Sequence, residues 1–498
     1  MRGAGPAFRP YPPRQAPKPV DANERRLGPL PVMKPSHNAA RPPLGPEAKP
    51  VLKVVFVTLF LDLVGFSIIF PLFPHMLEHY LFQEQATGPL TMLVDGLTRF
   101  SEWAGVSEQM SVTVLFGGVL GSLYSILQFV CAPILGRLSD RFGRKPILLV
   151  SIAGIAVSYG MWFFAGTFAM LVAARVLGGM MSGNISTATA VVADVTTPEN
   201  RSRGMAIIGI AFGVGFMFGP VIGGLAAGVD LTSHWPALAD YGVNPFSVPA
   251  LAALLLALGN LFLVAVWFRE TLRPGAPAAA AQRTVNPTRL FRAEAYPGVT
   301  RTNMVNFMFL LAFSGMEFSL AFLAVERFAY GPREIAFMLL FTGIVLAVTQ
   351  GAYVQARSAQ IGVKRMSGHG MLMVMAGLAI LAAAPNPAVL YCGLFFLGAG
   401  SAQVIPCLTT LASVYAPAHE QGRILGVFRS LGALARAVGP LAACLLYWRL
   451  GAEAAYFLAA LFMTGPLLLI RGLPTPGQNV PARATVPAEP APSESAKD

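Results

Sequence analysis

The sequence predicts an all-α polytopic membrane protein with twelve transmembrane helices, arranged as two six-helix bundles. Two observations on composition lead to this class: 55% of the 498 residues are hydrophobic and only 12% are charged, whereas about 25% of a soluble protein is charged. The third observation is a series of long apolar segments, because a helix of about 20 apolar residues crosses the hydrocarbon of a bilayer. A disordered or an ordinary soluble protein is thereby excluded.

Twelve apolar segments account for the predicted helices. They cover residues 51–76, 111–135, 146–166, 168–193, 204–228, 247–268, 302–326, 334–356, 366–384, 388–415, 423–446 and 453–472. The first six form one predicted bundle, residues 51–268, and the last six form the second, residues 302–472. A hinge loop rich in Pro, Ala and Arg, residues 269–301, joins them. Residues 1–50 and 473–498 have no apolar periodicity and are predicted to be disordered tails.

The distribution of Lys and Arg predicts the orientation. Loops after even-numbered segments, together with Arg423 at the start of the eleventh segment, hold sixteen of these residues, and loops after odd-numbered segments hold four. Because basic residues accumulate on the cytoplasmic side, both termini and the hinge are predicted to be cytoplasmic, in a cell (inner) membrane. The tail 1–50 carries nine Lys/Arg against three acidic residues, which we attribute to contact with anionic lipid rather than with nucleic acid.

The two halves of the chain are related to each other. Identical residues recur 220 positions apart, in the pairs Thr189/Thr409, Arg203/Arg423, Gly219/Gly439 and Pro220/Pro440. A repeat of six helices along the membrane normal is typical of transporters that rock two bundles around a central site.

The connection between the second and third segments carries the most specific motif. It reads Gly136-Arg-Leu-Ser-Asp140-Arg141-Phe-Gly143-Arg144-Lys145 and resembles the signature of the major facilitator superfamily. We expect Asp140 to lie at the positive N-terminus of the eleventh helix, and Arg144 to pair with Asp194. Such contacts would hold the outward-facing state and break in the inward-facing one. The simpler alternative is a basic loop that only sets topology. The matching loop, residues 356–365, has Ala359 in place of Asp140.

The fifth segment contains a run of glycines around a proline. It reads Gly215-xxx-Gly219-Pro220-xx-Gly223-Gly224 and resembles the motif of the antiporter branches of the superfamily. Pro220 kinks a helix, and glycines let helices approach closely. The alternative, a kinked packing helix, describes the same residues.

The first segment places Asp62 near the middle of the membrane, before Gly65 and a Pro71-xx-Pro74 end. This resembles the first helix of tetracycline/H⁺ antiporters. Together with residues 114–129, 190–194 and 429–440, it resembles the tetracycline-transporter-like branch, which includes animal organic-anion efflux carriers. A buried carboxyl can exchange a proton near neutral pH, so Asp62 is a predicted proton-coupling residue. The alternative is an Asp that only caps or pairs within the bundle.

Further ionisable residues in the apolar segments predict a central site. Arg429 and Arg436 are seven residues apart and share one helical stripe, and Glu317 is a second candidate for proton coupling. With Arg175 facing the same interior, the site would be positively charged and would favour an anionic or amphipathic organic substrate. The alternatives are that Arg175 is a buried structural pair and that Arg429 snorkels toward the cytoplasm. Neutral hydrogen bonds to substrate are predicted from Gln128, Asn184 and Gln403, although such residues often only bridge helices.

The sequence therefore predicts a secondary transporter that exports amphipathic organic molecules or drugs, with organic anions favoured, in exchange for protons. Two alternatives stay open: a facilitator or importer of a small metabolite, and a non-transporting receptor or scaffold on the same fold. No enzymatic activity, metal or cofactor is expected, because the four cysteines form no CxxC pair and no nucleotide-binding motif is present. The protein is expected to act as a monomer.

Overall fold

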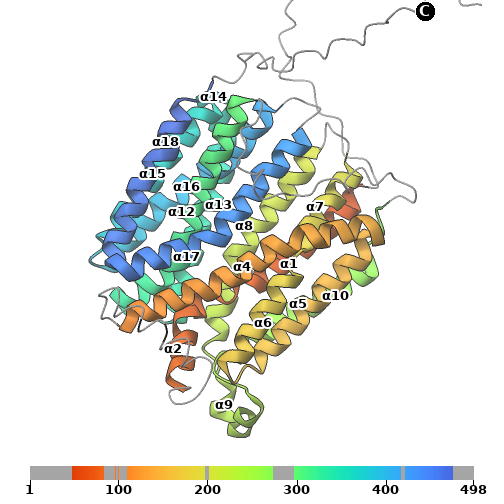
Figure 1. The fold of residues 1–498 in the computed structure, drawn as a ribbon, viewed down its shortest axis with the longest axis vertical. Coiled ribbons are helices and arrows are strands. Elements are labelled where there is room, and N and C mark those ends of the chain that lie inside the picture. Colours follow the sequence, from red (N-terminus) through yellow and green to blue (C-terminus); the bar gives the residue numbers. More distant parts are fainter. Residues whose placement is uncertain are drawn as a thin grey trace, which may run out of the picture. The chain divides into compact units, whose positions relative to one another are not determined.

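The computed structural model describes residues 48–83, 96, 99, 109–196, 201–272, 296–416 and 421–474, and their secondary structure is helical (Figure 1). Most of both predicted tails and most of the predicted hinge lie outside these residues, so the boundaries proposed for them stay predictions.

The first half of the chain supplies six membrane crossings. They are formed by α1 with η1 and α2, by α4, by α5, by α6 with α7, by α8, and by α10. The bounds are α1 Ala48–Ser67, η1 Phe70–Leu72, α2 Phe73–Gln83, α4 Gln109–Phe142, α5 Arg144–Phe163, α6 Phe168–Met181, α7 Asn184–Val195, α8 Arg201–Ala226, α9 Leu231–His234, η2 Pro236–Tyr241 and α10 Ser247–Trp267.

The second half repeats this arrangement. Its crossings begin with α12 and continue with α13, η3 and α14 as one interrupted helix. The bounds are α12 Pro297–Phe328, α13 Pro332–Val348, η3 Thr349–Val354, α14 Gln355–Ile361, α15 Val363–Ala382, α16 Pro387–Tyr415, α17 Gln421–Phe462 and α18 Thr464–Arg471. The segment η3 is a π-helix inside the eighth crossing.

Eleven helices in the described residues are long and apolar enough to cross a membrane. The last of them, Ile424–Arg471, has 48 residues and would be about 72 Å long as one helix, more than twice the hydrocarbon thickness. Gly451 breaks it with a φ of 79° and a ψ of 168°, so it forms two crossings. The prediction of twelve transmembrane helices in two bundles is confirmed.

One predicted loop is helical. Residues 136–142 were expected to leave the membrane as a loop, but they form the last two turns of α4. The chain reverses at the single residue Gly143, whose φ of 104° suits glycine, and α5 begins directly after it. The polar residues of this motif continue the helix beyond the apolar segment rather than ending it.

The repeat seen in the sequence also appears in the packing. In the first bundle Gly219 of α8 lies against Ser67, whose hydroxyl lies 3.3 Å from the Gly215 carbonyl oxygen. In the second bundle Gly439 of α17 lies against Ser314, whose hydroxyl lies 3.4 Å from the Ala435 carbonyl oxygen. The same contact thus joins the first and fifth helices of each bundle.

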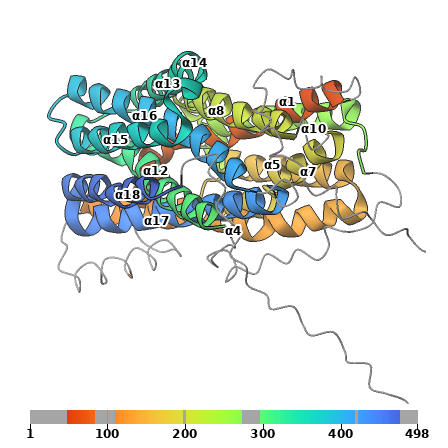
Figure 2. The ribbon, with the colours of Figure 1, turned by 90° about the horizontal axis from the view of Figure 1, so that it is seen from above.

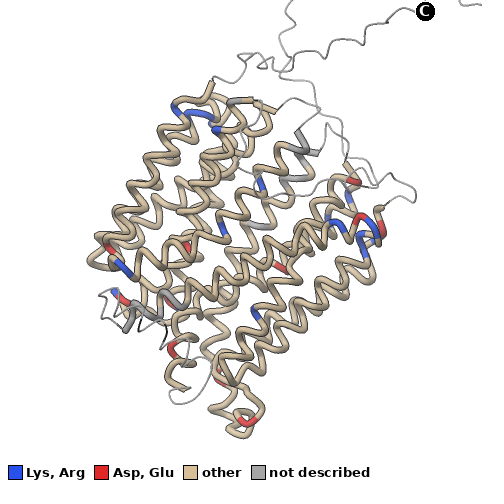
Figure 3. The backbone as a smooth tube through the Cα atoms, viewed as in Figure 1, with Lys and Arg blue, Asp and Glu red and all other residues tan. Residues whose placement is uncertain are grey.

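The bundles meet along two helix pairs, α4 with α17 and α8 with α13 (Figures 1 and 2). We call the membrane side that carries Arg144, Glu270 and Gly362 the hinge face, and the opposite side, with Ala165 and Ala384, the far face. One large hydrophobic cluster includes residues of both bundles. Three smaller clusters contain residues of one bundle each. Most charged residues lie near helix ends, and few lie along the helices (Figure 3).

Candidate functional site

The first candidate carboxylate, Asp62, lies on α1, which packs tightly against α8. The predicted packing glycines of α8 make this contact possible. A methyl group added at Gly215 would lie 2.7 Å from Leu63 Cβ, and one added at Gly223 would collide with the Ile68 carbonyl oxygen. Gly224, on another face of α8, packs against α13 of the second bundle. The glycines therefore position Asp62 and also join the two bundles.

Asp62 is half-buried and lies beside Asn184 of α7. Tyr124 and Tyr159 both interact electrostatically with Asp62 and with Arg175. The Arg175 side chain is only 4% exposed, and its guanidinium lies 4.9 Å from the centre of the Trp162 ring and 5.9 Å from that of Tyr124. Among the described residues no carboxylate lies within 4 Å of Arg175. Aromatic faces surround this charge, and the structure does not place it where a substrate would reach it.

The second bundle holds a different pair, Arg436 of α17 and Glu317 of α12. Arg436 lies deep in the protein, yet its side chain is exposed. It is one turn from Pro440 and two turns from Cys444, which contact α4 of the first bundle, so it points toward the space between the bundles. Glu317 is half-buried and interacts with Arg436 electrostatically, although no ion pair within 4 Å joins them in the described part of the chain.

Arg429 is half-buried and lies two turns nearer the hinge face on the same stripe of α17 as Arg436. Next to it, Asn306 of α12 donates a hydrogen bond to the Phe428 carbonyl oxygen over 3.2 Å. This bond fixes the helix that presents both arginines.

The three predicted neutral groups face neighbouring helices. Gln128 donates to the Ser182 carbonyl oxygen over 3.4 Å. Gln403 is 3% exposed and donates to Met373 Sδ of α15 and to the Ala399 carbonyl oxygen of its own helix, both over 3.1 Å. Asn184 is fully buried and lies beside Asp62. Only Gln128 is accessible enough to reach a substrate in this arrangement.

On the hinge face, Arg144 joins the ends of three helices. Its guanidinium lies 2.5 Å from Asp140 and 2.9 Å from Asp194, and it donates to the Ser139 hydroxyl over 2.8 Å. The neighbouring Lys145 donates to the Ala265 carbonyl oxygen over 2.8 Å. The expected pair of Arg144 with Asp194 is present. It lies within one bundle, however, and is formed although the bundles are separated on this face, as the glycine contacts below show. That this pair breaks in the inward-facing state stays a prediction.

Glu270, at the end of the sixth crossing, was not predicted. Its carboxylate accepts hydrogen bonds from the backbone N–H groups of Arg144, Lys145, Thr271 and Leu272 over 2.9–3.0 Å. Burial acts to raise the pKa of Glu270, but these N–H groups outweigh it and lower the pKa. A signal was available, because α5 begins at a glycine without a side-chain cap and its first N–H groups require an acceptor.

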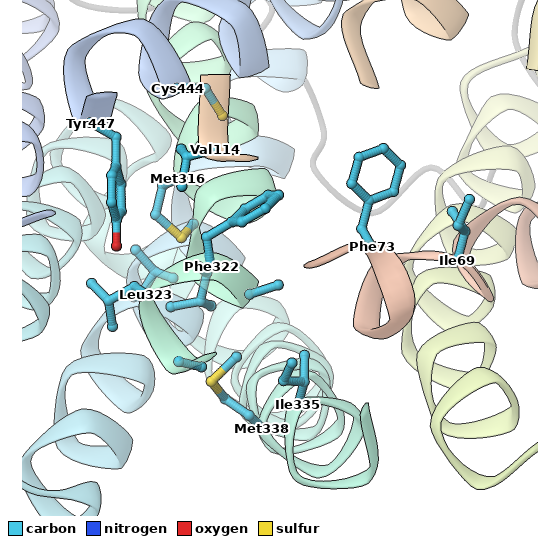
Figure 4. Packing of buried hydrophobic residues seen from close by; sticks show 14 of the residues in the cluster. Ile69, Phe73, Val114, Met316, Phe322, Leu323, Ile335, Met338, Cys444 and Tyr447 are labelled. Atoms are coloured by element: carbon cyan, nitrogen blue, oxygen red, sulfur yellow. The ribbon is translucent and has the colours of Figure 1, made fainter. Parts of the chain in front are cut away.

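The far face is closed by apolar contacts between the bundles. Phe73 and Val114 of the first bundle belong to the same cluster as Phe322 and Ile335 of the second (Figure 4). A methyl group added at Gly118 of α4 would lie 2.5 Å from Cys444 Cβ. These contacts leave no room between α4 and α17 at this level.

The space next to the glycines shows that the bundles are apart on the hinge face. Among the described residues, nothing lies within 4 Å of the position of an added methyl group at Gly209 or Gly213 of α8, or at Gly426 of α17. The bundles thus separate toward the hinge face, and Arg436 lies between the closed and the open ends. The arrangement presents a cationic group, two carboxylates in different bundles and access from one membrane side.

Comparison with known proteins identifies the family. The family model described as Major Facilitator Superfamily matches residues 55–440. Major facilitator superfamily domain-containing protein 10 of Bos taurus is 36% identical over 466 residues, which is 89% of this chain and 97% of that protein. The class C tetracycline resistance protein of Escherichia coli is 27% identical over 435 residues, 87% of this chain and 98% of that protein.

The crystal structure of the human organic anion transporter MFSD10 (TETRAN) is also similar. It has a TM-score of 0.67 and 32% identity, and the match covers 86% of this chain and 100% of that one. The matched region includes the motif around Asp140, the glycines of α8 and both candidate carboxylates. The chain therefore belongs to the major facilitator superfamily, in its tetracycline-transporter-like branch, and is an integral membrane transporter of small substrates rather than an enzyme.

Proposed function

We propose that this transporter exports amphipathic organic anions, including drugs, in exchange for protons, and that it does so by alternating access. The observation that carries the proposal is Arg436, an exposed arginine at the centre of a membrane-spanning segment with no carboxylate within 4 Å in the described part of the chain. A cation in such a place that no carboxylate contacts directly favours binding of an anion. The human relative named an organic anion transporter supports the same substrate class.

The excess of Lys and Arg on the hinge face supports a cytoplasmic location for that face and for both termini. With this orientation the structure is inward-facing, and an anion enters from the cytoplasm and meets Arg429 before Arg436. Net charge inside the path favours entry of an anion over a cation.

Glu317 would make anion binding depend on pH. When Glu317 is ionised, it competes with the substrate for Arg436. When it takes up a proton, Arg436 is released, so anion binding strengthens as pH falls. The Glu317–Arg436 pair alone would make the proton and the anion bind together, which is the opposite of exchange. The exchanged proton must therefore be carried by another group.

We assign the exchanged proton to Asp62 in the other bundle. An ionised carboxylate enclosed without a neighbouring cation is costly. Asp62 can be satisfied either by a proton or by hydrogen-bond donors of the substrate, and these two occupants exclude each other. Such competition at one carboxylate is what exchange requires.

The gate on the hinge face would close between α4 and α17. Gly118 packs against Cys444 on the far face, and the two helices run in opposite directions. Eighteen residues are five helical turns. Gly136 therefore lies on the same face of α4 as Gly118, and Gly426 lies on the same face of α17 as Cys444, so closure would bring Gly136 to Gly426. Asp140, one turn further, would then lie at the first turn of α17, where a carboxylate is favoured.

The test is proton flux in liposomes that contain the purified protein and a trapped pH dye. An imposed proton gradient and a panel of organic anions and cations should give anion-dependent proton movement, and Asp62→Asn should abolish it. Asp240→Asn, at an exposed position on the far face, is the matched control and should behave as wild type. Anion transport without proton movement would favour the facilitator instead. Absence of flux with every compound would favour the receptor.

A further inference from the structure

We propose that the outer edge of the second bundle on the hinge face binds the phosphate group of an anionic phospholipid from the leaflet on that side. The site is formed by three cationic side chains, Arg301 near the start of α12, Lys364 near the start of α15 and Arg471 at the end of α18. We call these three residues the basic cluster. The inference goes beyond the proposed function, because it concerns a lipid that stays bound and is not transported.

The basic cluster surrounds the backbone that ends α18. Arg301 donates to the Gly472 carbonyl oxygen, and Lys364 donates to the Leu473 carbonyl oxygen. Arg471 directly precedes these two residues and is exposed. The helices α12 and α15 both pack against α18. Three helices therefore bring three positive charges to one turn of backbone.

No carboxylate neutralises the basic cluster in the part of the second bundle that the structure describes. The acidic residues of that part lie in the membrane interior or on the far face, and they are Glu317, Glu326, Glu334 and Glu453. Among the described residues in Figure 3, Lys and Arg stand without Asp or Glu at the hinge end of the second bundle, whereas both signs are mixed at that of the first. The carbonyl acceptors are neutral, so the three charges attract an anion from outside the chain.

The first bundle shows which kind of group occupies the corresponding position. A methyl group added at Gly143 would lie 2.7 Å from a carboxylate oxygen of Glu270, which accepts hydrogen bonds from the first N–H groups of α5. At Gly362, the equivalent turn residue, nothing among the described residues lies within 4 Å of an added methyl group, and α15 begins without a side-chain cap. The place of an anionic oxygen in one half is therefore open in the other, beside Lys364.

Exposed apolar side chains continue the surface from the basic cluster into the membrane. Leu468 is three residues before Arg471 on the same face of α18, and Leu372 is about two turns further along α15 than Lys364. These leucines are 61% and 47% exposed. Both helices lie on the side of the second bundle away from the first (Figures 1 and 2). Cations at the membrane boundary above apolar side chains fit a phospholipid headgroup with its acyl chains, and not a free phosphate ion.

Lipid binding to the purified full-length protein tests the proposal. Native mass spectrometry compares phosphatidylglycerol with phosphatidylcholine of the same acyl chains, because only phosphatidylglycerol carries a net negative charge. The wild type should bind phosphatidylglycerol at least tenfold more tightly. Arg301→Gln with Arg471→Gln should lose at least tenfold of that affinity and keep its affinity for phosphatidylcholine. The glutamine at position 301 can still donate to the Gly472 carbonyl oxygen, so the variant should fold.

The matched control removes two charges from the hinge face of the first bundle. Arg137→Gln with Arg141→Gln changes two exposed side chains on the helical turns that also carry Asp140, and it should bind phosphatidylglycerol as wild type does. Equal losses in the two double variants would mean that any basic surface attracts the lipid, and this result would overturn the proposal. Unchanged binding in Arg301→Gln/Arg471→Gln would overturn it as well.

Thermal unfolding in detergent gives a second measurement and separates the lipid from free phosphate. Phosphatidylglycerol should raise the Tm of the wild type, because a ligand that binds only the folded protein stabilises it, and it should leave the Tm of Arg301→Gln/Arg471→Gln unchanged. Inorganic phosphate at millimolar concentration should not change either Tm. Equal stabilisation by phosphate would rule out the assignment to a lipid. A lipid effect of wild-type size in the double variant would rule out the basic cluster as the site.

Discussion

The turns that open the third and ninth crossings share a backbone but differ in charge. Gly143 and Gly362 reverse the chain with φ values of 104° and 83°. The lysine two residues after each donates to a carbonyl at the end of the last helix of its bundle, Lys145 to Ala265 and Lys364 to Leu473. The repeat therefore preserves how each bundle is tied together on the hinge face.

The remaining contacts at the two turns have diverged. The first turn holds Arg144 between two carboxylates, and Glu270 caps α5. At the second turn Ala359 occupies the position of Asp140, and the acceptors are neutral carbonyl groups. Arg301 donates to the Gly472 carbonyl oxygen, and Tyr415 donates to the Pro474 carbonyl oxygen. The first turn thus depends on carboxylates, whereas the cations of the second donate to neutral carbonyl groups, so protonation of carboxylates at low pH should affect the first turn alone.

The largest effect is expected from Arg144→Ala. The change leaves Asp140 and Asp194, each about a quarter exposed, close together without their cation, and hydrogen bonds to charged groups contribute about 1.5–3 kcal/mol. Transport measured in liposomes should fall by more than about tenfold. The control in the second turn is Arg365→Ala, an exposed residue, which should leave transport unchanged. Equal losses in both variants would show that the two turns are alike.

A smaller effect is expected from Glu270→Gln, which keeps the shape of the cap but removes its charge. Loss of a good helix cap costs about 1 kcal/mol, and thermal unfolding in detergent measures it. Because the pKa of Glu270 is lowered in the folded protein, its contribution is present above the unfolded value of 4.5 and is lost as pH falls below it. The variant and wild type should therefore converge at acidic pH. A difference that persists there would contradict the charge argument.

The smallest effect is expected from rebuilding the charge in the second turn. Ala359→Asp with Val363→Arg copies the spacing of Asp140 and Arg144 across the turn at Gly362, where Ala359 is exposed and Val363 half-buried, and an ion pair near the surface contributes about 0.2–1 kcal/mol. Thermal unfolding should change by no more than this, and transport should stay normal. A large gain in stability would mean that the second turn lacks only the charges.

The fold could be predicted because apolar length and the 220-residue repeat are local properties of the sequence. The helical state of residues 136–142 was missed because their polar side chains resemble a loop, although a helix can continue beyond the membrane. The site was predicted less well. The sequence identifies Arg175 and Arg436 as ionisable residues in membrane segments, but only tertiary packing decides that aromatic rings enclose one and that the other is exposed.

Anion binding to Arg436 is the most direct test of the account. Binding of a labelled organic anion to the purified protein should weaken by at least about tenfold in Arg436→Gln, because hydrogen bonds to charged groups contribute about 1.5–3 kcal/mol. Arg449→Gln, on the same helix near the far face, should bind as wild type, and in Asp62→Asn, which removes the competing proton site, binding should strengthen as pH falls. Unchanged affinity in Arg436→Gln, or binding by Asp62→Asn that weakens on acidification, would contradict the account.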